Sequence, residues 1–501
     1  MSQLDIGIVV AYLVITLAIG LWAGKGVNTV KQYAIGSKNY GTFIIVATLF
    51  ATNVGGGSTI GTTEKVLTVG VMYALITLGM PVNKFVTAYC VAPFMNRFRN
   101  KISIGEIMHT CYGKPGQVIT GIMGTLLAIG IVGGQIGALG YVGNYFWGLD
   151  RLYSTLIAAG IVVIYSSIGG VRAVAFTDVF QFAIALYVIP MIYYESSWRI
   201  GGIGQLWKQV PAEKLQLATN WQDWIIYISL FLAYCTPSLE PSFTQRLLMA
   251  RDAIQAQNTM KSLIWADVLF FAAITCIAFS SSVLAPDVNP NHAFFHILQT
   301  VLSEGWKGIA VAGVLAFIMS TADSDLNAAS VCLIHDTVQP LKREPLAASA
   351  ELKWLRVATV ATGTLAIVAA LSFQSLIDLM WSVYDLWAPC IVIPLFACVM
   401  GYKSSIRAFS FAVATGFLCT TAWKLWGPTW IRSMLPGMMA NFIAFYIARY
   451  FDKPEDIYWD ESEFDPTIPA QKRKWKRQWE QKHGKVSQMP EDQEQTKEEQ
   501  E

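Results

Sequence analysis

The chain has 501 residues, of which 54% are hydrophobic and 14% charged, and its mean hydropathy is +0.44. Soluble domains carry about 25% charged residues, so this composition excludes an ordinary soluble domain and predicts a polytopic membrane protein. The net charge of +2 gives no indication of a nucleic-acid partner. The eight cysteines contain no CxxC pair and the five histidines have no ligand spacing. The cysteines and histidines therefore indicate neither a disulfide scaffold nor a metal site.

Hydropathy divides the chain into about thirteen apolar segments, each near the ~20 residues that a helix needs to cross a bilayer. The expected spans are residues 4–24, 41–62, 68–95, 117–147, 152–168, 174–194, 224–245, 259–285, 307–335, 354–373, 376–401, 404–424 and 434–450. The first segment lacks a basic leader and a clear cleavage site, so we expect a retained span rather than a signal peptide. Residues 1–450 would thus form one transmembrane domain.

Beyond residue 450 the composition becomes strongly charged. Residues 451–501 are therefore predicted to be a disordered cytoplasmic tail. A basic and aromatic patch at 472–477 could bind anionic lipid or could simply be solvated, and the sequence favours neither.

Lysine and arginine residues alternate between rich and poor loops along the chain. The rich loops lie near residues 25–38, 97–101, 246–261, 342–356 and 403–407. Basic loops stay on the cytoplasmic side, so these loops should face the cytoplasm. With an odd number of spans, the N-terminus would lie outside and the C-terminus inside a plasma (inner) membrane.

Two of the expected spans are interrupted. Span 41–62 contains Ala51-Thr52-Asn53-Val54-Gly55-Gly56-Gly57, and span 224–245 contains Pro237 and Pro241 with Glu240 between them. Glycines weaken a helix and prolines remove its hydrogen bonds, while lipid cannot satisfy the freed backbone groups. A packing kink would explain either break alone. Two breaks at matching places in consecutive sets of five spans instead indicate an inverted-repeat transporter, with repeats at 41–194 and 224–401.

A third polar stretch, Met319-Ser320-Thr321-Ala322-Asp323-Ser324, lies inside the span at 307–335. Ser320, Asp323 and Ser324 are spaced i, i+3 and i+4 and share one helix face. Hydroxyls can bond back to their own helix, but a carboxylate at membrane depth needs a partner and marks an ion or substrate path. Hard cations prefer oxygen ligands, so this face is a candidate sodium site.

The motifs resemble those of the sodium:solute symporter family over about residues 4–450. The run from Gly169 to Gln181 is similar to the family pattern GG-x-x-AV-x-x-TD-x-x-Q, and Met319–Ser324 is similar to M-S-[ST]-x-x-S. Gln245-Arg246 closes the second broken helix in the family's manner. Within the family, the stretches at 53–57 and 320–324 resemble the branch that contains the high-affinity choline transporter.

This resemblance implies an all-α, leucine-transporter-type fold with a 5+5 inverted repeat, one leading helix and two trailing helices. It also implies sodium-driven import of a small organic solute by alternating access, with no cofactor besides the coupling sodium. The main sodium ligands would be the carbonyls of Ala51, Val54 and Phe317 and the hydroxyls of Ser320 and Thr321. A second cation site, found in some members, would comprise Asp178, Ser320, Asp323 and Ser324. Asp323 replaces a hydroxyl of several members, which leaves the number of ions open.

Eight residues are candidate substrate ligands: Asn53, Gly55, Gly56, Tyr73, Gln135, Glu240, Phe243 and Asp385. Asn53 and Gln135 could instead cross-link helices. Glu240 could pair with Arg246, and Asp178 could cap its helix.

Four further side chains are not expected to take part in the solute or ion sites. Trp381 and Trp387 are more typical of a lipid-facing belt. Asp267 is given no role, and Asp325 is expected to point away from the site, toward the cytoplasmic end.

The identity of the solute is left open. The choline branch has an aromatic residue where this chain has Asn53, and a quaternary ammonium needs aromatic faces, so choline itself is not expected. A sensor is disfavoured because a tail of about fifty residues is too short for a kinase domain. An enzyme is disfavoured because HExxH and GxSxG motifs are missing. A sodium-independent facilitator or channel stays an alternative that sodium-free uptake would separate.

Overall fold

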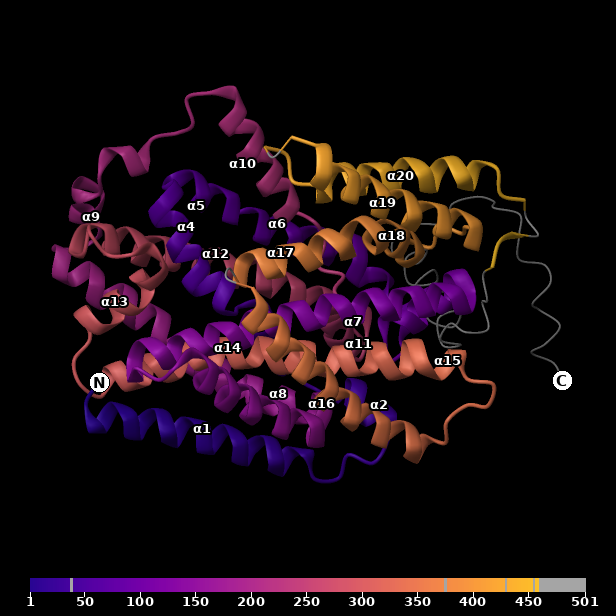
Figure 1. Cartoon of the computed structure of the whole chain (residues 1–501), viewed down its shortest axis with the longest axis horizontal. Helices are drawn as coiled ribbons and strands as arrows, with labels where there is room; N and C mark the ends of the chain where they lie inside the picture. The colour runs from indigo at the N-terminus through magenta and orange to yellow at the C-terminus, as the bar shows by residue number, and fades with distance from the viewer. Residues whose placement is uncertain (37–38, 374–375, 429, 454–455, 459–501) are drawn as a thin grey trace, which may run out of the picture.

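The computed structural model describes the chain except for residues 37–38, 374–375, 429, 454–455 and 459–501. The predicted tail at 451–501 and its basic patch thus lie almost entirely outside the described residues. The described part is helical, with one isolated bridge between Ser405 and Ile457. Most helices run along the long axis of the molecule (Figure 1).

The first half of the chain forms α1 (Gln3–Gly24), α2 (Val30–Ile35), α3 (Thr42–Asn53), α4 (Thr62–Val69), α5 (Val71–Thr77), α6 (Gly79–Val86), α7 (Ile104–Trp147), α8 (Arg151–Ile200), α9 (Ile203–Gln209) and α10 (Trp221–Tyr234). The second half forms α11 (Pro241–Leu248), α12 (Ala253–Leu284), α13 (Ala293–Val301), α14 (Trp306–Val331), α15 (Gln339–Leu341), α16 (Ala348–Ser372), α17 (Leu376–Trp387), α18 (Ile393–Met400), α19 (Ile406–Trp426) and α20 (Met434–Tyr450). Short 3-10 and π turns extend several of them.

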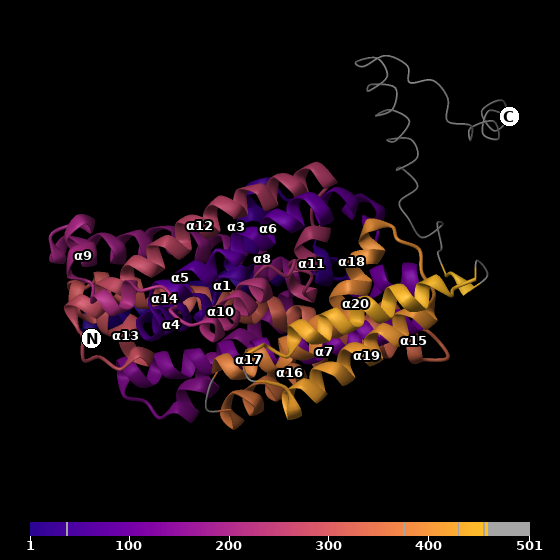
Figure 2. The same cartoon turned by 90° about the horizontal axis from the view of Figure 1, so that it is seen from above.

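Helix α14 forms the centre of the bundle. It packs against α1, α7, α8 and α16, and 94% of its most apolar window is buried. The final pair, α19 and α20, lies side by side at the edge of the bundle (Figure 2). The polar stretch at 319–324 is therefore enclosed by other helices rather than by lipid.

Nine helices of the described chain are long and apolar enough to span a membrane, or ten if the pair Thr42–Asn53 and Gly57–Val69, bent by 62°, is one span. The membrane-spanning helical architecture is confirmed, but this number differs from thirteen. Helix α8 merges two expected spans, because Gly170 bends the chain with a φ of 52° without ending the hydrogen-bonded helix. Helix α20 has only 17 residues, and the segment α10–α11 is split at its prolines.

The two ends of the bundle carry different loops. Asp5 at the start of α1 accepts hydrogen bonds from the N–H groups of Gly305 and Gly308, at 2.8 and 2.9 Å, before and within α14. Helices α9 and α13 lie at this same end, at the left of Figure 1, whereas α2 and α15 lie toward the other. The basic segments at 25–36 and 342–356 thus lie away from the N-terminus.

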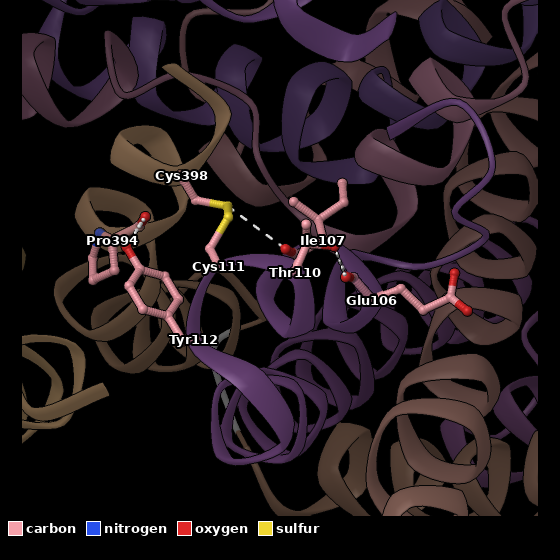
Figure 3. The surroundings of a disulfide bond; sticks show 7 residues. All are labelled: Glu106, Ile107, Thr110, Cys111, Tyr112, Pro394 and Cys398. Atoms are coloured by element: carbon pink, nitrogen blue, oxygen red, sulfur yellow. Dashed lines mark hydrogen bonds between the residues drawn. A yellow bond between two sulfur atoms is a disulfide. The ribbon is translucent and has the colours of Figure 1, made fainter. Parts of the chain in front are cut away.

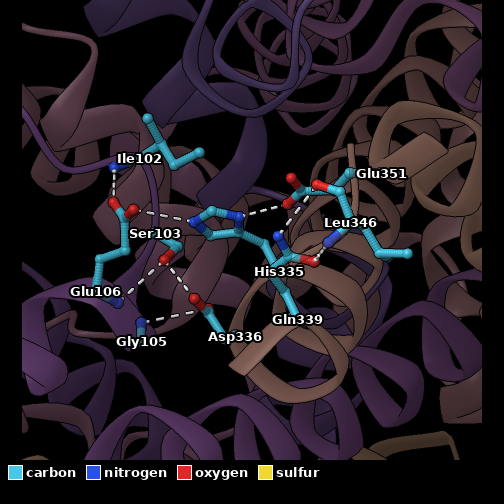
Figure 4. Close-up of polar contacts among 9 residues, drawn as sticks. All are labelled: Ile102, Ser103, Gly105, Glu106, His335, Asp336, Gln339, Leu346 and Glu351. Atoms are coloured by element: carbon cyan, nitrogen blue, oxygen red, sulfur yellow. Dashed lines mark hydrogen bonds and ion pairs between the residues drawn. The ribbon is translucent and has the colours of Figure 1, made fainter. Parts of the chain in front are cut away.

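A polar network joins three helices at the end that carries the basic loops (Figure 4). His335 contacts Glu351 through Nδ1 at 2.6 Å and Glu106 through Nε2 at 3.0 Å. The neighbouring Asp336 accepts hydrogen bonds from the hydroxyl of Ser103 and the N–H of Gly105. These contacts tie the end of the central helix to the starts of α7 and α16.

One disulfide, Cys111–Cys398, joins α7 to α18 (Figure 3). Beside it, the Tyr112 hydroxyl donates to the carbonyl oxygen of Pro394 at 2.8 Å. The expectation that the cysteines form no disulfide is wrong for this pair. The bonded residues are 287 positions apart, so only the tertiary structure brings them together.

Candidate functional site

Both predicted helix breaks are present. Helix α3 ends at Asn53, Val54 leaves helical geometry with φ −103° and ψ 96°, and a π turn begins at Gly57. The second break separates Tyr234, the last residue of α10, from Pro241, the first residue of α11. A cavity of about 190 Å³ lies between the two breaks and is also lined by α6, α7 and α17.

The freed backbone of the first break is satisfied by side chains. The Gly56 N–H donates to Gln135 Oε1 at 2.9 Å, and the Ser58 and Thr59 hydroxyls donate to the carbonyls of Asn53 and Gly55, at 3.1 and 3.0 Å. An interrupted helix is tolerated at membrane depth only when protein groups supply such partners. Gln135 therefore has the helix-linking role that was one of its two alternatives, and it lines the cavity as well.

Six of the eight candidate substrate residues line the cavity: Asn53, Gly55, Tyr73, Gln135, Glu240 and Phe243. The hydroxyls of Tyr73 and Tyr234 lie 2.9 Å apart on one wall, and Tyr384 donates to Glu240 Oε1 at 3.3 Å on another. The cavity thus combines aromatic surfaces with a few polar groups, as small-molecule sites do.

Gly56 and Asp385 do not line the cavity. Gly56 is packed against α7, where an added Cβ would lie 3.0 Å from the Cβ of Ala138. Asp385 faces the segment between α19 and α20 instead, with Lys424 Nζ at 3.0 Å and Arg432 Nη2 at 3.9 Å. Two basic residues distant in sequence draw this carboxylate away from the cavity, so its predicted substrate contact is wrong.

Three side chains expected elsewhere are found at the cavity. Trp381 and Trp387 line it, and Trp387 is 1% exposed, so these residues do not form a lipid-facing belt. Asp325 also lines the cavity and is buried rather than pointing away from the site. Each error has the same cause: hydropathy does not show which helix face meets the protein interior.

Lys84 of α6 is the main cavity residue that the sequence analysis missed. Its Nζ donates to Asn53 Oδ1 at 3.0 Å and to Ser238 Oγ at 2.9 Å, so it joins the first helix break to the second. The ammonium also lies 4.8 Å from the ring centroid of Phe243, within cation–π range. A lysine in the middle of the apolar span 68–95 is itself a functional signal, and it could have identified this residue.

Asn53 connects Lys84 to a carboxylate on α12. Its Nδ2 donates to Asp267 Oδ1 at 3.4 Å, while its Oδ1 accepts from the ammonium. Asp267 is fully buried in the middle of its helix and so belongs to the surroundings of the site. Asn53 therefore cross-links helices, which was one of its two predicted roles, and it also lines the cavity where a solute contact was predicted.

The predicted main sodium ligands lie where α14 meets the first break. Thr321 Oγ1 is 3.4 Å from the carbonyl oxygen of Ala51 and 3.2 Å from that of Phe317. Val54 is buried at the same break. Ser320 is less favourably placed, because its hydroxyl donates to Asp178. Carbonyl and hydroxyl oxygens fit a hard cation, so the donor set suits sodium.

The four residues of the predicted second cation site are all fully buried, in a network that spans α3, α8 and α14. Asp178 accepts hydrogen bonds from the hydroxyls of Thr48 and Ser320. Asp323 Oδ2 accepts from the Tyr165 hydroxyl at 2.6 Å, and Ser324 Oγ lies 2.9 Å from Thr52 Oγ1.

The alternative that Asp178 caps its helix is wrong. Asp178 lies eight residues beyond the Gly170 kink at which the second half of α8 begins, too far along the helix to cap it. Its carboxylate bonds to hydroxyls of α3 and α14 rather than to the start of its own helix.

Arg246 is the second basic residue whose place the sequence analysis missed. Its Nη2 donates to Ser324 Oγ at 2.5 Å and its Nη1 to the Ser242 carbonyl at 3.4 Å. Arg246 therefore faces the acidic network, and the proposed pair with Glu240 is wrong. The fully buried guanidinium is charged at neutral pH, so it balances part of the negative charge of Asp178 and Asp323.

Comparison with known proteins identifies the chain. The sequence profile of the sodium:solute symporter family matches residues 33–405. The chain belongs to the sodium:solute symporter family. Among curated relatives of this symporter, sodium/proline symporter 2 of Staphylococcus saprophyticus is 23% identical over 485 residues, covering 89% of this chain and 93% of that protein. The sodium/proline symporter of Staphylococcus aureus is 22% identical over 476 residues, covering 89% and 92%.

Solved transporters share the fold of this symporter. A Na+-coupled sialic acid symporter, solved in a substrate-bound outward-open state, has a TM-score of 0.78 at 16% identity, covering 90% of this chain and 99% of its own. Mhp1, a nucleobase-cation-symport-1 family transporter, has a TM-score of 0.60 at 13% identity, covering 88% and 98%. These neighbours have the leucine-transporter-type fold that the family resemblance implied.

Family membership confirms the broad function expected from the motifs. The chain is a sodium-coupled symporter of a small solute, and it is a transporter rather than an enzyme. Sodium is its coupling ion.

Proposed function

We propose that this symporter imports a small organic solute together with sodium by alternating access between two halves of an inverted repeat. The observation that carries the proposal is the cavity between two broken helices, with the Ala51, Phe317 and Thr321 oxygens beside one break. Broken helices at a repeat interface are where transporters of this kind bind ion and solute. The relatives' transport of proline makes an amino acid a reasonable first solute to test.

In this proposal the main sodium site couples ion binding to solute binding through the first break. Its ligands are the carbonyls of Ala51, Val54 and Phe317 and the hydroxyls of Ser320 and Thr321. Val54 directly follows Asn53 and Ala51 lies two residues before it, and Asn53 lines the cavity. Sodium held between α3 and α14 would fix the position of the Asn53 side chain, so that the solute meets a formed site only when the ion is bound.

The second cation site, made of Asp178, Ser320, Asp323 and Ser324, forms the inner part of the ion path. Two observations support it. Asp323 Oδ1 is buried and lacks a hydrogen-bond partner within the described chain, and a buried carboxylate oxygen is costly to leave unpaired. Asp178 already binds the Ser320 hydroxyl, so the two proposed sodium sites share a ligand. Arg246 bonds to Ser324 and would have to release it to a passing ion.

For the topology we propose thirteen spans, repeats at 41–194 and 224–401, an external N-terminus and a cytoplasmic C-terminus in the plasma membrane. The double length of α8, the 17 residues of α20 and the split α10–α11 segment account for the spans that a length criterion does not separate. A membrane-impermeant thiol reagent should label Ser2→Cys but not Pro490→Cys in intact cells, relative to the parent chain. Labelling at 490 would refute this orientation.

Uptake into proteoliposomes tests the function itself. Full-length protein should accumulate a solute from a screened panel only when a sodium gradient is imposed. Equal uptake without sodium would favour the facilitator or channel alternative. The panel should include choline, because the resemblance to the choline branch at residues 53–57 and 320–324 stays a prediction, and Asn53 leads us to expect no choline uptake.

A further inference from the structure

The cavity has two chemically opposite poles. One is the ammonium of Lys84, whose carbon chain and head are completely buried. The other is the carboxylate of Glu240, which lies in the second helix break and also lines the cavity. Buried charges of this kind are retained where they meet partners or ligands of opposite charge.

Lys84 keeps part of its hydrogen-bonding capacity for a ligand. An ammonium has three donors. Two are used by Asn53 Oδ1 and Ser238 Oγ, at 3.0 and 2.9 Å, and both acceptors are neutral. The third donor has no hydrogen-bond acceptor within the described chain, although the lysine lines the cavity.

Glu240 is similarly incomplete. Tyr384 donates to Oε1 at 3.3 Å, a long contact, and no basic side chain of the described residues forms an ion pair with this carboxylate. Lys84 and Glu240 line the same cavity without forming an ion pair with each other in the described chain, and Asn53 lies between Lys84 and the carboxylate of Asp267. The cavity is therefore lined by two opposite charges, neither of which forms an ion pair within the described chain.

The walls between the poles are aromatic. Tyr73, Tyr234, Trp381 and Tyr384 line the cavity, and the rings of Tyr234 and Trp381 meet edge to face at 5.6 Å. Aromatic faces hold an apolar group and also favour a nearby ammonium.

We propose that the transported solute is zwitterionic, with a carboxylate that binds Lys84 and an ammonium that binds Glu240. This inference rests on the proposed function and specifies its substrate class as an amino acid or a close analogue. A simple anion would leave Glu240 unpaired, and a simple cation would leave the third donor of Lys84 unpaired. Each loss leaves a charged group of the cavity wall without a partner of opposite charge, which is costly in a site shielded from water.

Matched probes test the two poles separately. Purified full-length protein in sodium chloride is screened with the proteinogenic L-amino acids by thermal shift. The amino acid that stabilises it most is compared with its carboxamide, which lacks the carboxylate, and with its deaminated acid, which lacks the ammonium. We expect the zwitterion to bind at least about tenfold more tightly than either.

Two substitutions assign the poles. Lys84→Met should remove the preference for the amino acid over its carboxamide and keep the preference over the deaminated acid, whereas Glu240→Gln should do the reverse. Lys208 and Glu213 are exposed, so Lys208→Met and Glu213→Gln serve as matched controls. They should change neither the preference over the carboxamide nor the preference over the deaminated acid. If Lys84 has a purely structural role, Lys84→Met should weaken the binding of all three compounds equally, and that result would overturn its assignment as the carboxylate-binding pole.

The substrate class and the proposed function fail in different ways. If a non-zwitterionic solute accumulates under a sodium gradient while amino acids bind no better than their amides and acids, the zwitterion proposal is wrong and symport stands. If no solute of any class accumulates with sodium, the proposed function itself is wrong.

Discussion

Two polar clusters lie near the first helix break, and each contains one basic side chain. The cavity cluster consists of Lys84, Asn53, Ser238 and Glu240, and the carboxylate cluster consists of Asp178, Ser320, Asp323, Ser324 and Arg246. The cavity cluster surrounds a hollow and keeps a lysine donor and a carboxylate oxygen free. In the carboxylate cluster, hydroxyls and the guanidinium bond mainly to one another across helices.

This difference shows how one chain can separate solute binding from ion passage. A cavity with unpaired opposite charges is prepared for a ligand, since the protein has already buried them. A network whose members bond to one another holds helices together, and an ion can pass only by displacing one of those bonds. The following variants test whether the two clusters have these separate roles.

The substitution Arg246→Met should have the largest effect, a loss of stability of the folded protein. Removing the guanidinium deletes the positive charge beside Asp178 and Asp323 together with its hydrogen bonds to Ser324 and the Ser242 carbonyl. Each hydrogen bond of a charged group contributes about 1.5–3 kcal/mol. Thermal unfolding of the purified protein should shift strongly downward. Arg251→Met is the control, because Arg251 pairs with Asp252 on the surface with 69% of its side chain exposed. An equal, small shift in both variants would contradict a charge-balancing role for Arg246.

The next effect concerns Gly55, which lies between the cavity-lining Gln135 and Thr321 of the proposed main sodium site. An added Cβ would lie 2.7 Å from Gln135 Oε1 and 2.8 Å from Thr321 Oγ1. Gly55→Ala should therefore raise the half-maximal concentrations of both sodium and solute, by about tenfold each. Gly57→Ala is the control, since its new methyl group would meet only Met380, at 3.7 Å. The test is uptake measured as a function of the sodium concentration and of the solute concentration. Equal half-maximal concentrations in the two variants would show that Gly55 does not link the sodium site to the solute site.

Substitutions in the carboxylate cluster should change the coupling to sodium and leave solute binding unchanged. Asp178→Asn and Asp323→Asn should each reduce the number of sodium ions coupled per solute, or slow transport while solute binding survives. Reversal potentials in proteoliposomes measure the first quantity and equilibrium binding measures the second. Asp287→Asn, on the exposed loop before α13, is the control. Wild-type stoichiometry and rate in both variants would leave these aspartates with a purely structural role.

The smallest effect is expected from single hydroxyls. Thr321→Ala and Ser320→Ala should each raise the half-maximal sodium concentration, by about three- to tenfold, because a lost oxygen ligand resembles a lost hydrogen bond of about 1 kcal/mol. We expect Thr321→Ala to have the larger effect, since Ser320 is engaged by Asp178. Thr364→Ala, an exposed threonine bonded to its own helix, should leave sodium dependence unchanged. Unaltered sodium dependence in both site variants would refute the main-site assignment.

The sequence by itself determined the features that depend on local chemistry. Apolar segments of spanning length predicted a helical membrane protein, and glycines at 55–57 and prolines at 237 and 241 predicted both helix breaks, because these residues weaken a helix wherever they occur. The motifs at 169–181 and 319–324 predicted the family. Six of eight substrate candidates line the cavity: Asn53, Gly55, Glu240 and Phe243 lie at or beside the breaks along the chain, whereas Tyr73 and Gln135 come from α5 and α7.

Only the tertiary structure decided which charges meet. Lys84 bonds to residues 31 and 154 positions away, and Arg246 to a serine 78 positions away, and such pairings have no local signature. The same reason explains the errors: Asp385 faces Lys424 rather than the cavity, while Trp387 and Asp325 face inward. Hydropathy shows that a segment is buried in lipid or protein, but the rotation of each helix is set by packing against its neighbours. That rotation placed one lysine at the junction of both broken helices.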